Sequence, residues 1–202
     1  MQLRSNAEQR HFFEKQGWLQ LEAAIDAKQL NRLEQLLKQA SDRHPECKGR
    51  DLIVVDEELQ RFFAKAAWLK LFLEFCQKKS ARIAWSHYVT RAEEHYPIMQ
   101  GTQLEQLSCV KPLYGAILIV FDLVQLNVGT PITLERGDVL LFSSQFQGDF
   151  AMLFAHHPVL WLAIGGEKAQ YLSEPRDPFI PRLKALGYAF GDHLHAPEHP
   201  SI

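Results

Sequence analysis

Hydrophobic residues in the first 79 positions recur at helical spacing. Asp26 stands where a helix N-cap belongs, and Gln29 follows at the position that completes a capping box. The apolar residues after them are three or four positions apart, as on one helix face: Ile25, Leu30, Leu33, Leu36, Leu37 and Ala40. Residues 41–50 contain Pro45 and Gly49, which are typical of a helix end. The pattern predicts an amphipathic helix that begins after Asp26 and ends in this loop.

A second helical pattern begins at Asp56, which can serve as its N-cap. One face carries Leu59, Phe62, Phe63, Ala66, Leu69 and Leu73. Trp68, Phe72 and Phe75 make the segment apolar nearly all round. We therefore expect a largely buried helix that packs against a sheet.

After Ser80 the pattern changes from helical to extended. Segments rich in β-branched and aromatic residues, bounded by Gly and Pro, predict strands at residues 82–89, 104–110, 114–126, 139–142, 150–154 and 159–164. A run of helices followed by a run of strands is typical of an α+β fold with the helices packed outside an antiparallel sheet or barrel. The last part of the chain is rich in proline and histidine and predicts one short helix with an irregular tail.

The length of 202 residues predicts a single domain, because one core of this size needs no second unit. Its parts would be a mainly helical segment at residues 1–79, a β-rich core at 80–172, and a C-terminal helix and tail at 173–202. A net charge of -2 disfavours nucleic acid as a partner, because phosphates require a basic face. The longest apolar run, residues 113–126, contains Asp122 and is too short to span a membrane. The N-terminus lacks a secretory signal pattern, so we expect a cytoplasmic protein without a membrane partner.

Four stretches of the chain are similar to one known family. They are residues 11–19 (HFFEKQGWL) with the capped helix after them, 115–123 (GAILIVFDL), 134–142 (LERGDVLLF) and 182–188 (RLKALGY). Together they resemble the phytanoyl-CoA dioxygenase-like branch of the iron(II)/2-oxoglutarate-dependent oxygenases. The resemblance implies a double-stranded β-helix, a cupin-like jelly-roll, whose mouth holds the metal and the co-substrate.

The resemblance also implies a set of metal ligands, and this chain departs from it. Such oxygenases need a His-x-Asp/Glu pair and a distal histidine, which bind one face of the iron. The only His-x-Glu here begins at His44, in a loop before the β-region. By spacing, the family's ligand positions fall on Gln103 and Glu105 and on Gln147. Glutamine is a neutral carbonyl donor and replaces imidazole poorly at iron.

The co-substrate position departs from the family in the same way. Where an arginine would bind the far carboxylate of 2-oxoglutarate, the chain has His156 and His157. The chain is therefore identified as a divergent member without the metal-binding triad. We expect it to need no cofactor and to bind a small molecule or a protein, through a pocket lined by Gln103, Glu105, Gln147 and His157.

Two alternatives remain open. The chain could be a divergent dioxygenase that uses iron(II) and 2-oxoglutarate through other ligands, with His87 or His95 folded into the mouth. Separately, Asp192, His193 and His195 could bind a transition metal in the tail, although a polar terminus that happens to be rich in histidine is the favoured interpretation.

Overall fold

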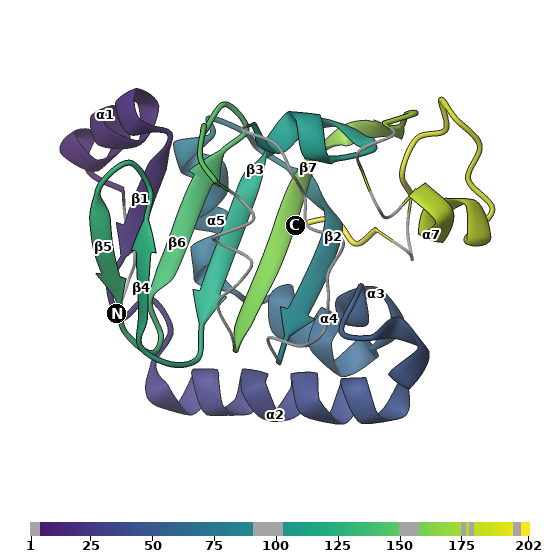
Figure 1. Ribbon diagram of the computed structural model, residues 1–202, viewed down its shortest axis with the longest axis horizontal. Helices are drawn as coiled ribbons and strands as arrows, with labels where there is room; N and C mark the ends of the chain where they lie inside the picture. The colour runs from purple at the N-terminus through teal and green to yellow at the C-terminus, as the bar shows by residue number, and fades with distance from the viewer. Residues whose placement is uncertain (1–4, 91–102, 150–157, 175–176, 178–179, 196–198) are drawn as a thin grey trace.

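The computed structural model describes residues 5–90, 103–149, 158–174, 177, 180–195 and 199–202 (Figure 1). Its helices are α1 Ala7–Gln16, α2 Ala27–Arg43, α3 Leu52–Val55, α4 Glu57–Phe63, α5 Ala67–Phe75 and α7 Ile180–Ala185, with 3-10 turns η1 Pro45–Cys47 and η2 Leu104–Leu107. Its strands are β1 Trp18–Leu21, β2 Ala81–Val89, β3 Val110–Val120, β4 Val124–Asn127, β5 Pro131–Leu134, β6 Val139–Ser143 and β7 Val159–Tyr171. Helices precede most of the strands, as the α+β prediction requires.

Five strands form one antiparallel sheet in the order β1-β6-β3-β7-β2. The β4–β5 hairpin forms a separate two-stranded sheet, and an isolated antiparallel bridge joins Gln103 to Gln147. Neighbours in the large sheet are far apart in the sequence, which is the crossing order of a jelly-roll. The predicted jelly-roll-like core with outer helices is therefore confirmed.

Helices cover one face of the large sheet. Figure 1 shows α5 behind the sheet and α2 running across the ends of the strands. The buried side chains of both helices form one apolar cluster with the strand residues Ile117, Ile119, Leu141, Leu160, Leu162 and Ile164. A second apolar cluster lies on the opposite face, between the large sheet and the β4–β5 hairpin. We call these the outer and the inner face of the sheet.

The turn before β6 links the helical layer to the sheet. Gly137 has φ +94°, and a Cβ there would approach the carbonyl oxygen of Ile25 to 2.6 Å. The carboxylate of Asp138 accepts hydrogen bonds from Ala23 N and Glu135 N, each at 2.9 Å, and from Gln20 Nε2 at 2.9 Å. This Gly-Asp turn therefore fixes the chain between β1 and α2 against the sheet.

The helix predicted from Asp56 is two helices in the structure. α4 ends at Phe63 and α5 begins at Ala67, with Ala66 in an extended conformation. Neither glycine nor proline marks this break. Phe63 and Trp68 meet edge to face across it, with ring centroids 5.7 Å apart, so tertiary packing explains the interruption.

Two strand predictions need correction, and one strand was missed. Residues 104–109 are not a strand, because η2 occupies Leu104–Leu107 and β3 begins only at Val110. Cys109 N donates to the Asp177 carboxylate, and Val110 N donates to Ser108 Oγ. The segment 114–126 is divided between β3 and β4, and β5 was not predicted. The strand predicted at 150–154 lies outside the described residues.

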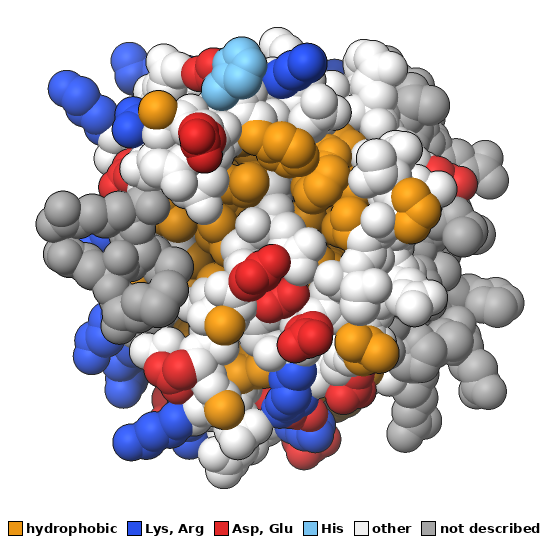
Figure 2. Space-filling view, turned by 90° about the vertical axis from the view of Figure 1, so that its left-hand side faces the viewer, with side chains coloured by type: hydrophobic (Ala, Val, Ile, Leu, Met, Phe, Trp, Pro, Cys, Tyr) orange, Lys and Arg blue, Asp and Glu red, His pale blue; other side chains and the backbone are white. Residues whose placement is uncertain are grey.

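The side of the molecule formed by α1, β1 and the β4–β5 hairpin is partly apolar. Figure 2 shows hydrophobic side chains gathered across this side. On these elements Phe12 is 38% exposed and packs edge to face on the half-buried Trp18, with centroids 5.1 Å apart. No described helix is long and apolar enough to cross a membrane.

Candidate ligand site on the inner face of the jelly-roll

Strand register defines which side chains share the inner face. Directly opposite residues in antiparallel strands point to the same side of a sheet. One such row crosses the whole sheet: Gln20, Leu140, Leu118, Trp161, His87 and, through an isolated bridge, Arg50. Because Leu118 and Trp161 belong to the inner apolar cluster, His87 and Arg50 also lie on the inner face.

The structure brings together two of the positions that spacing assigned to metal ligands. Gln103 and Gln147 are partners in an antiparallel bridge, although 44 positions separate them in the sequence (147 minus 103). Their side chains therefore lie on one side of the bridge, with Cβ atoms about 5 Å apart. Gln103 is half-buried and Gln147 is exposed.

The other predicted pocket residues lie in different parts of the chain. Glu105 lies in η2, two residues beyond the bridge, and is half-buried. Between it and Gln103, Leu104 is completely buried in the inner cluster. His157, like His95, lies outside the described residues.

A buried polar group on the edge of β2 was not predicted. Arg50 Nε donates to the Asp51 carboxylate at 3.2 Å, and the guanidinium lies 4.5 Å from the ring centroid of Trp85. Asp51 also accepts from Ser86 N at 3.1 Å. The sequence contains one signal for it: Gly49 has φ +77°, and a Cβ there would lie 2.2 Å from the carbonyl oxygen of Tyr88. This glycine lets the loop approach β2 and place Arg50 on the inner face.

His87 is completely buried within this group. Burial, reinforced by the positive charge of Arg50, holds its pKa well below the usual value of 6.5. The imidazole is therefore neutral at physiological pH.

Further groups lie near Arg50 on the same side of the sheet. The backbone N–H of Cys109 donates to the buried carboxylate of Asp177 at 2.5 Å. Burial and the Asp177 charge raise the pKa of the Cys109 thiol far above its ordinary value, while Arg50 opposes this. Cys109 is therefore a protonated thiol and not a nucleophile at neutral pH.

The histidine-rich tail places its three candidate ligands against different partners. Asp192 accepts from Ala189 N at 2.7 Å, and His193 Nδ1 lies 3.0 Å from the carbonyl oxygen of Lys168. The His195 ring stacks on Tyr188 with centroids 4.9 Å apart. These contacts draw the three side chains in separate directions.

The described residues at the positions that spacing assigns to metal ligands do not fit iron(II). Gln103 and Gln147 offer neutral carboxamides, and Glu105 offers one carboxylate, whereas the iron of such oxygenases needs two imidazoles and a carboxylate. In the part of the chain that the structure describes, no three His, Cys, Asp or Glu side chains form a group that could hold a metal ion. His156 and His157 lie outside that part.

Comparison with known proteins was informative only at the level of structure. No protein-family model matches the chain, and no curated protein sequence matches it. Among solved structures, the chain is similar to the non-heme alpha ketoglutarate dependent carbocyclase SnoK from nogalamycin biosynthesis, with a TM-score of 0.66 and 10% identity over 98% of this chain and 97% of that one.

Two further solved structures are similar. One is the epimerase SnoN, also from nogalamycin biosynthesis, in complex with Fe3+, alpha ketoglutarate and nogalamycin RO. It matches with a TM-score of 0.66 and 10% identity over 96% of this chain and 97% of that one. CT296 from Chlamydia trachomatis matches with a TM-score of 0.52 and 14% identity over 82% of this chain and 97% of that one. At such low identities the likeness concerns the fold alone, and that fold is the jelly-roll of 2-oxoglutarate-dependent enzymes (alpha ketoglutarate is the same compound).

Proposed function

We propose that this protein keeps the 2-oxoglutarate oxygenase fold but binds a small molecule or a protein without carrying out iron-dependent oxidation. The observation that carries the proposal is the bridge between Gln103 and Gln147. Spacing assigned both positions to metal-binding imidazoles, and both hold carboxamides. Paired carboxamides donate and accept hydrogen bonds, so they suit a polar, uncharged group better than a metal ion.

Aromatic packing near the bridge supports the same proposal. The rings of Phe142 and Trp161 stack with centroids 5.6 Å apart, and Phe146 packs on Phe142 at 4.8 Å. All three side chains are buried in the inner cluster, and Phe146 directly precedes Gln147. The rings occupy interior volume beside the bridge and so reduce the room for a charged co-substrate there.

The finer assignments belong to the same proposal. We place the chain in the phytanoyl-CoA dioxygenase-like branch on the strength of its Gly-Asp turn and the segments beside it. We propose a cytoplasmic location from its ordinary soluble-protein composition.

The test is an anaerobic iron(II) titration of two proteins, with and without 2-oxoglutarate. We expect the wild-type protein to show no stoichiometric binding. The double variant Gln103→His/Gln147→His should gain iron binding, because two imidazoles would then lie beside each other near Glu105. Gln103→His/Gln145→His is the matched control, since Gln145 lies in the same loop but outside the bridge.

Two results would count against the proposal. One-to-one binding by the wild-type protein, strengthened by 2-oxoglutarate, would make it an oxygenase with other ligands. Equal iron binding by the double variant and its matched control would show that Gln103 and Gln147 do not share a ligand site.

A divergent iron(II)/2-oxoglutarate-dependent dioxygenase is the second candidate function. It is favoured by the neutral, inward-facing imidazole of His87, which has the protonation state of a metal ligand. If the wild-type protein binds iron, His87→Gln should weaken that binding at least about tenfold, as loss of one ligand requires. Unchanged affinity in His87→Gln would remove this residue from the site.

A further inference from the structure

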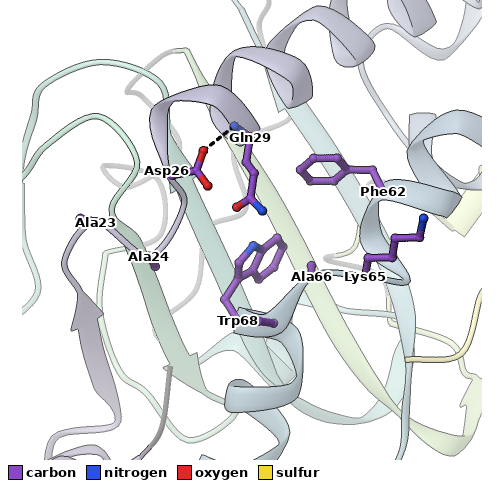
Figure 3. Close-up of a pocket in the computed structure, with 9 residues that line it drawn as sticks. Ala23, Ala24, Asp26, Gln29, Phe62, Lys65, Ala66 and Trp68 are labelled. Atoms are coloured by element: carbon purple, nitrogen blue, oxygen red, sulfur yellow. Dashed lines mark hydrogen bonds between the residues drawn. The ribbon is translucent and has the colours of Figure 1, made fainter. Parts of the chain in front are cut away.

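A separate pocket lies in the helical layer, on the other side of the sheet from the Gln103–Gln147 bridge. It has a volume of about 340 Å³ and lies between the start of α2, the end of α4 and the start of α5 (Figure 3). This volume falls in the range of small-molecule sites. Its lining combines apolar and polar side chains, including Phe62, Asp26, Gln29 and Trp68.

Trp68 supplies a hydrogen-bond donor to this pocket. Its side chain is only 4% exposed, yet its indole N–H has no hydrogen-bond partner among the described residues. Unlike the indole nitrogens of Trp85 and Trp161, this nitrogen keeps some exposure to solvent. Figure 3 shows the ring reaching into the pocket from α5, opposite the side chain of Gln29. A donor on a side chain that is otherwise buried is available to an acceptor that a ligand supplies.

The start of α5 adds further donors beside Trp68. Its N-cap is Ala66, which has no side-chain oxygen to cap the first N–H groups. Leu69 N bonds to Ala66 O, but for Ala67 N and Trp68 N no acceptor occurs among the described residues. Uncapped N–H groups and the positive end of the helix dipole both favour an anionic oxygen beside Trp68.

The pocket lining also carries a negative charge. Asp26 caps α2 through one carboxylate oxygen, which accepts from Gln29 N at 2.8 Å. Its charge lines the same pocket, together with the Gln29 carboxamide. Phe62 and the alanines at residues 23, 24 and 66 provide the apolar part of the lining. Lys65 lines the pocket as well, from an exposed position.

We propose that this pocket binds a small zwitterion of the α-amino-acid class. Its carboxylate would accept from Trp68 Nε1 and the α5 N-terminus, and its ammonium group would lie against Asp26 and Gln29. An apolar side chain would contact Phe62. A ligand with both charges fits this lining better than a simple anion, because an anion alone would face the Asp26 carboxylate without compensation.

The test follows the indole N–H resonance of Trp68 in ¹⁵N-labelled full-length protein, assigned with Trp68→Phe. The probes are L-phenylalanine, its amide, which lacks the carboxylate, and 3-phenylpropionate, which lacks the ammonium group. We expect a saturable shift at millimolar L-phenylalanine and at least about tenfold weaker binding of the other two, since each loses a charge-assisted hydrogen bond.

Three variants locate the site. Trp68→Phe keeps the ring but removes the donor, and Asp26→Asn keeps the helix cap but removes the charge. Each should weaken L-phenylalanine binding at least about fivefold, measured by calorimetry. Lys70→Ala, at an exposed position of α5, should leave it unchanged.

Three outcomes would overturn the proposal. They are no saturable shift with any probe, equal binding of all three probes, and unchanged affinity in both pocket variants. The result is independent of iron binding at the Gln103–Gln147 bridge, which lies on the other side of the sheet.

Discussion

The two faces of the large sheet are built from the same strands but differ in what they bury. The outer face presents aliphatic residues such as Ile117 and Leu162 to the helices. The inner face presents Trp85, Phe142 and Trp161, with His87 and Arg50 buried beside them. Burying a charged or polar side chain carries a desolvation cost that an aliphatic one does not. The outer face is therefore held mainly by apolar burial, whereas the inner face also carries the cost of burying polar and charged side chains.

The largest expected effect comes from the outer face. Phe72 in α5 is completely buried, so Phe72→Ala should lower the free energy of unfolding by about 3–5 kcal/mol in urea denaturation. Phe190→Ala is the control, because Phe190 is 51% exposed and should cost less than about 1 kcal/mol. Equal costs would mean that the helices do not pack on the sheet as described.

The next effect probes the inner face. Asp51→Asn removes the negative charge that pairs with Arg50 but keeps an acceptor for Ser86 N. It should lower the free energy of unfolding by about 3 kcal/mol, because the buried guanidinium loses its charged partner. Glu167→Gln is the matched control, because Glu167 pairs with Arg82 at 2.8 Å in a more exposed position. We expect it to lower the free energy of unfolding by less than about 1 kcal/mol. A smaller loss in Asp51→Asn than in the control would contradict the burial of this pair.

A pH effect should distinguish the faces further. The pKa of His87 is lowered by burial, so its contribution to stability is complete above the unfolded-state value of about 6.5. Below that pH, His87 binds a proton in the unfolded chain but not in the folded protein. The free energy of unfolding therefore falls by about 1.4 kcal/mol per pH unit until the lowered pKa is reached. Unfolding free energies measured from neutral to mildly acidic pH should show this slope in the wild-type protein but not in His87→Leu. Parallel slopes would place His87 in contact with water.

The smallest effect lies at the edge of the outer layer. Arg136 bonds to Glu34 at 2.8 Å, which, with Lys38, lowers the pKa of that carboxyl. This contact joins α2 to the Gly-Asp turn, but both side chains are partly exposed. Glu34→Gln should therefore lower the free energy of unfolding by at most about 1 kcal/mol near neutral pH. The difference between variant and wild type should shrink in acid, because Glu34 then becomes protonated. A large loss in thermal denaturation would show that polar contacts, and not apolar burial, hold the helical layer.

Local signals predicted the parts of the fold that local chemistry controls. The helix after Asp26 is α2, and its five predicted apolar positions from Leu30 to Ala40 are all buried. The Asp26 carboxylate accepts from Gln29 N as expected, but the Gln29 side chain lines the pocket of the helical layer. The jelly-roll followed from resemblance in several short segments and is confirmed. The single-domain organisation and the cytoplasmic location stay predictions.

The candidate site was predictable only in part. Spacing along the chain selected Gln103 and Gln147, and the structure joins them in an antiparallel bridge. Glu105 lies two residues beyond that bridge, and His157 lies outside the described residues. Arg50 and Asp51 were missed because they lie in a loop whose role depends on contact with β2. The break between α4 and α5, which opens the Trp68 pocket, likewise has no local marker.

The sequence by itself determined the order of helices and strands and the capped start of α2, and the assignment of Gln103 and Gln147 to the family's ligand positions stays a prediction. These properties depend on residue type and short-range spacing, which a chain carries in any conformation. Only the tertiary structure decided that Arg50 and His87 share the inner face, and that the starts of α2 and α5 meet at one pocket. Such contacts join residues far apart in the chain, and they form only when the burial of both faces of the sheet brings the strands and helices together.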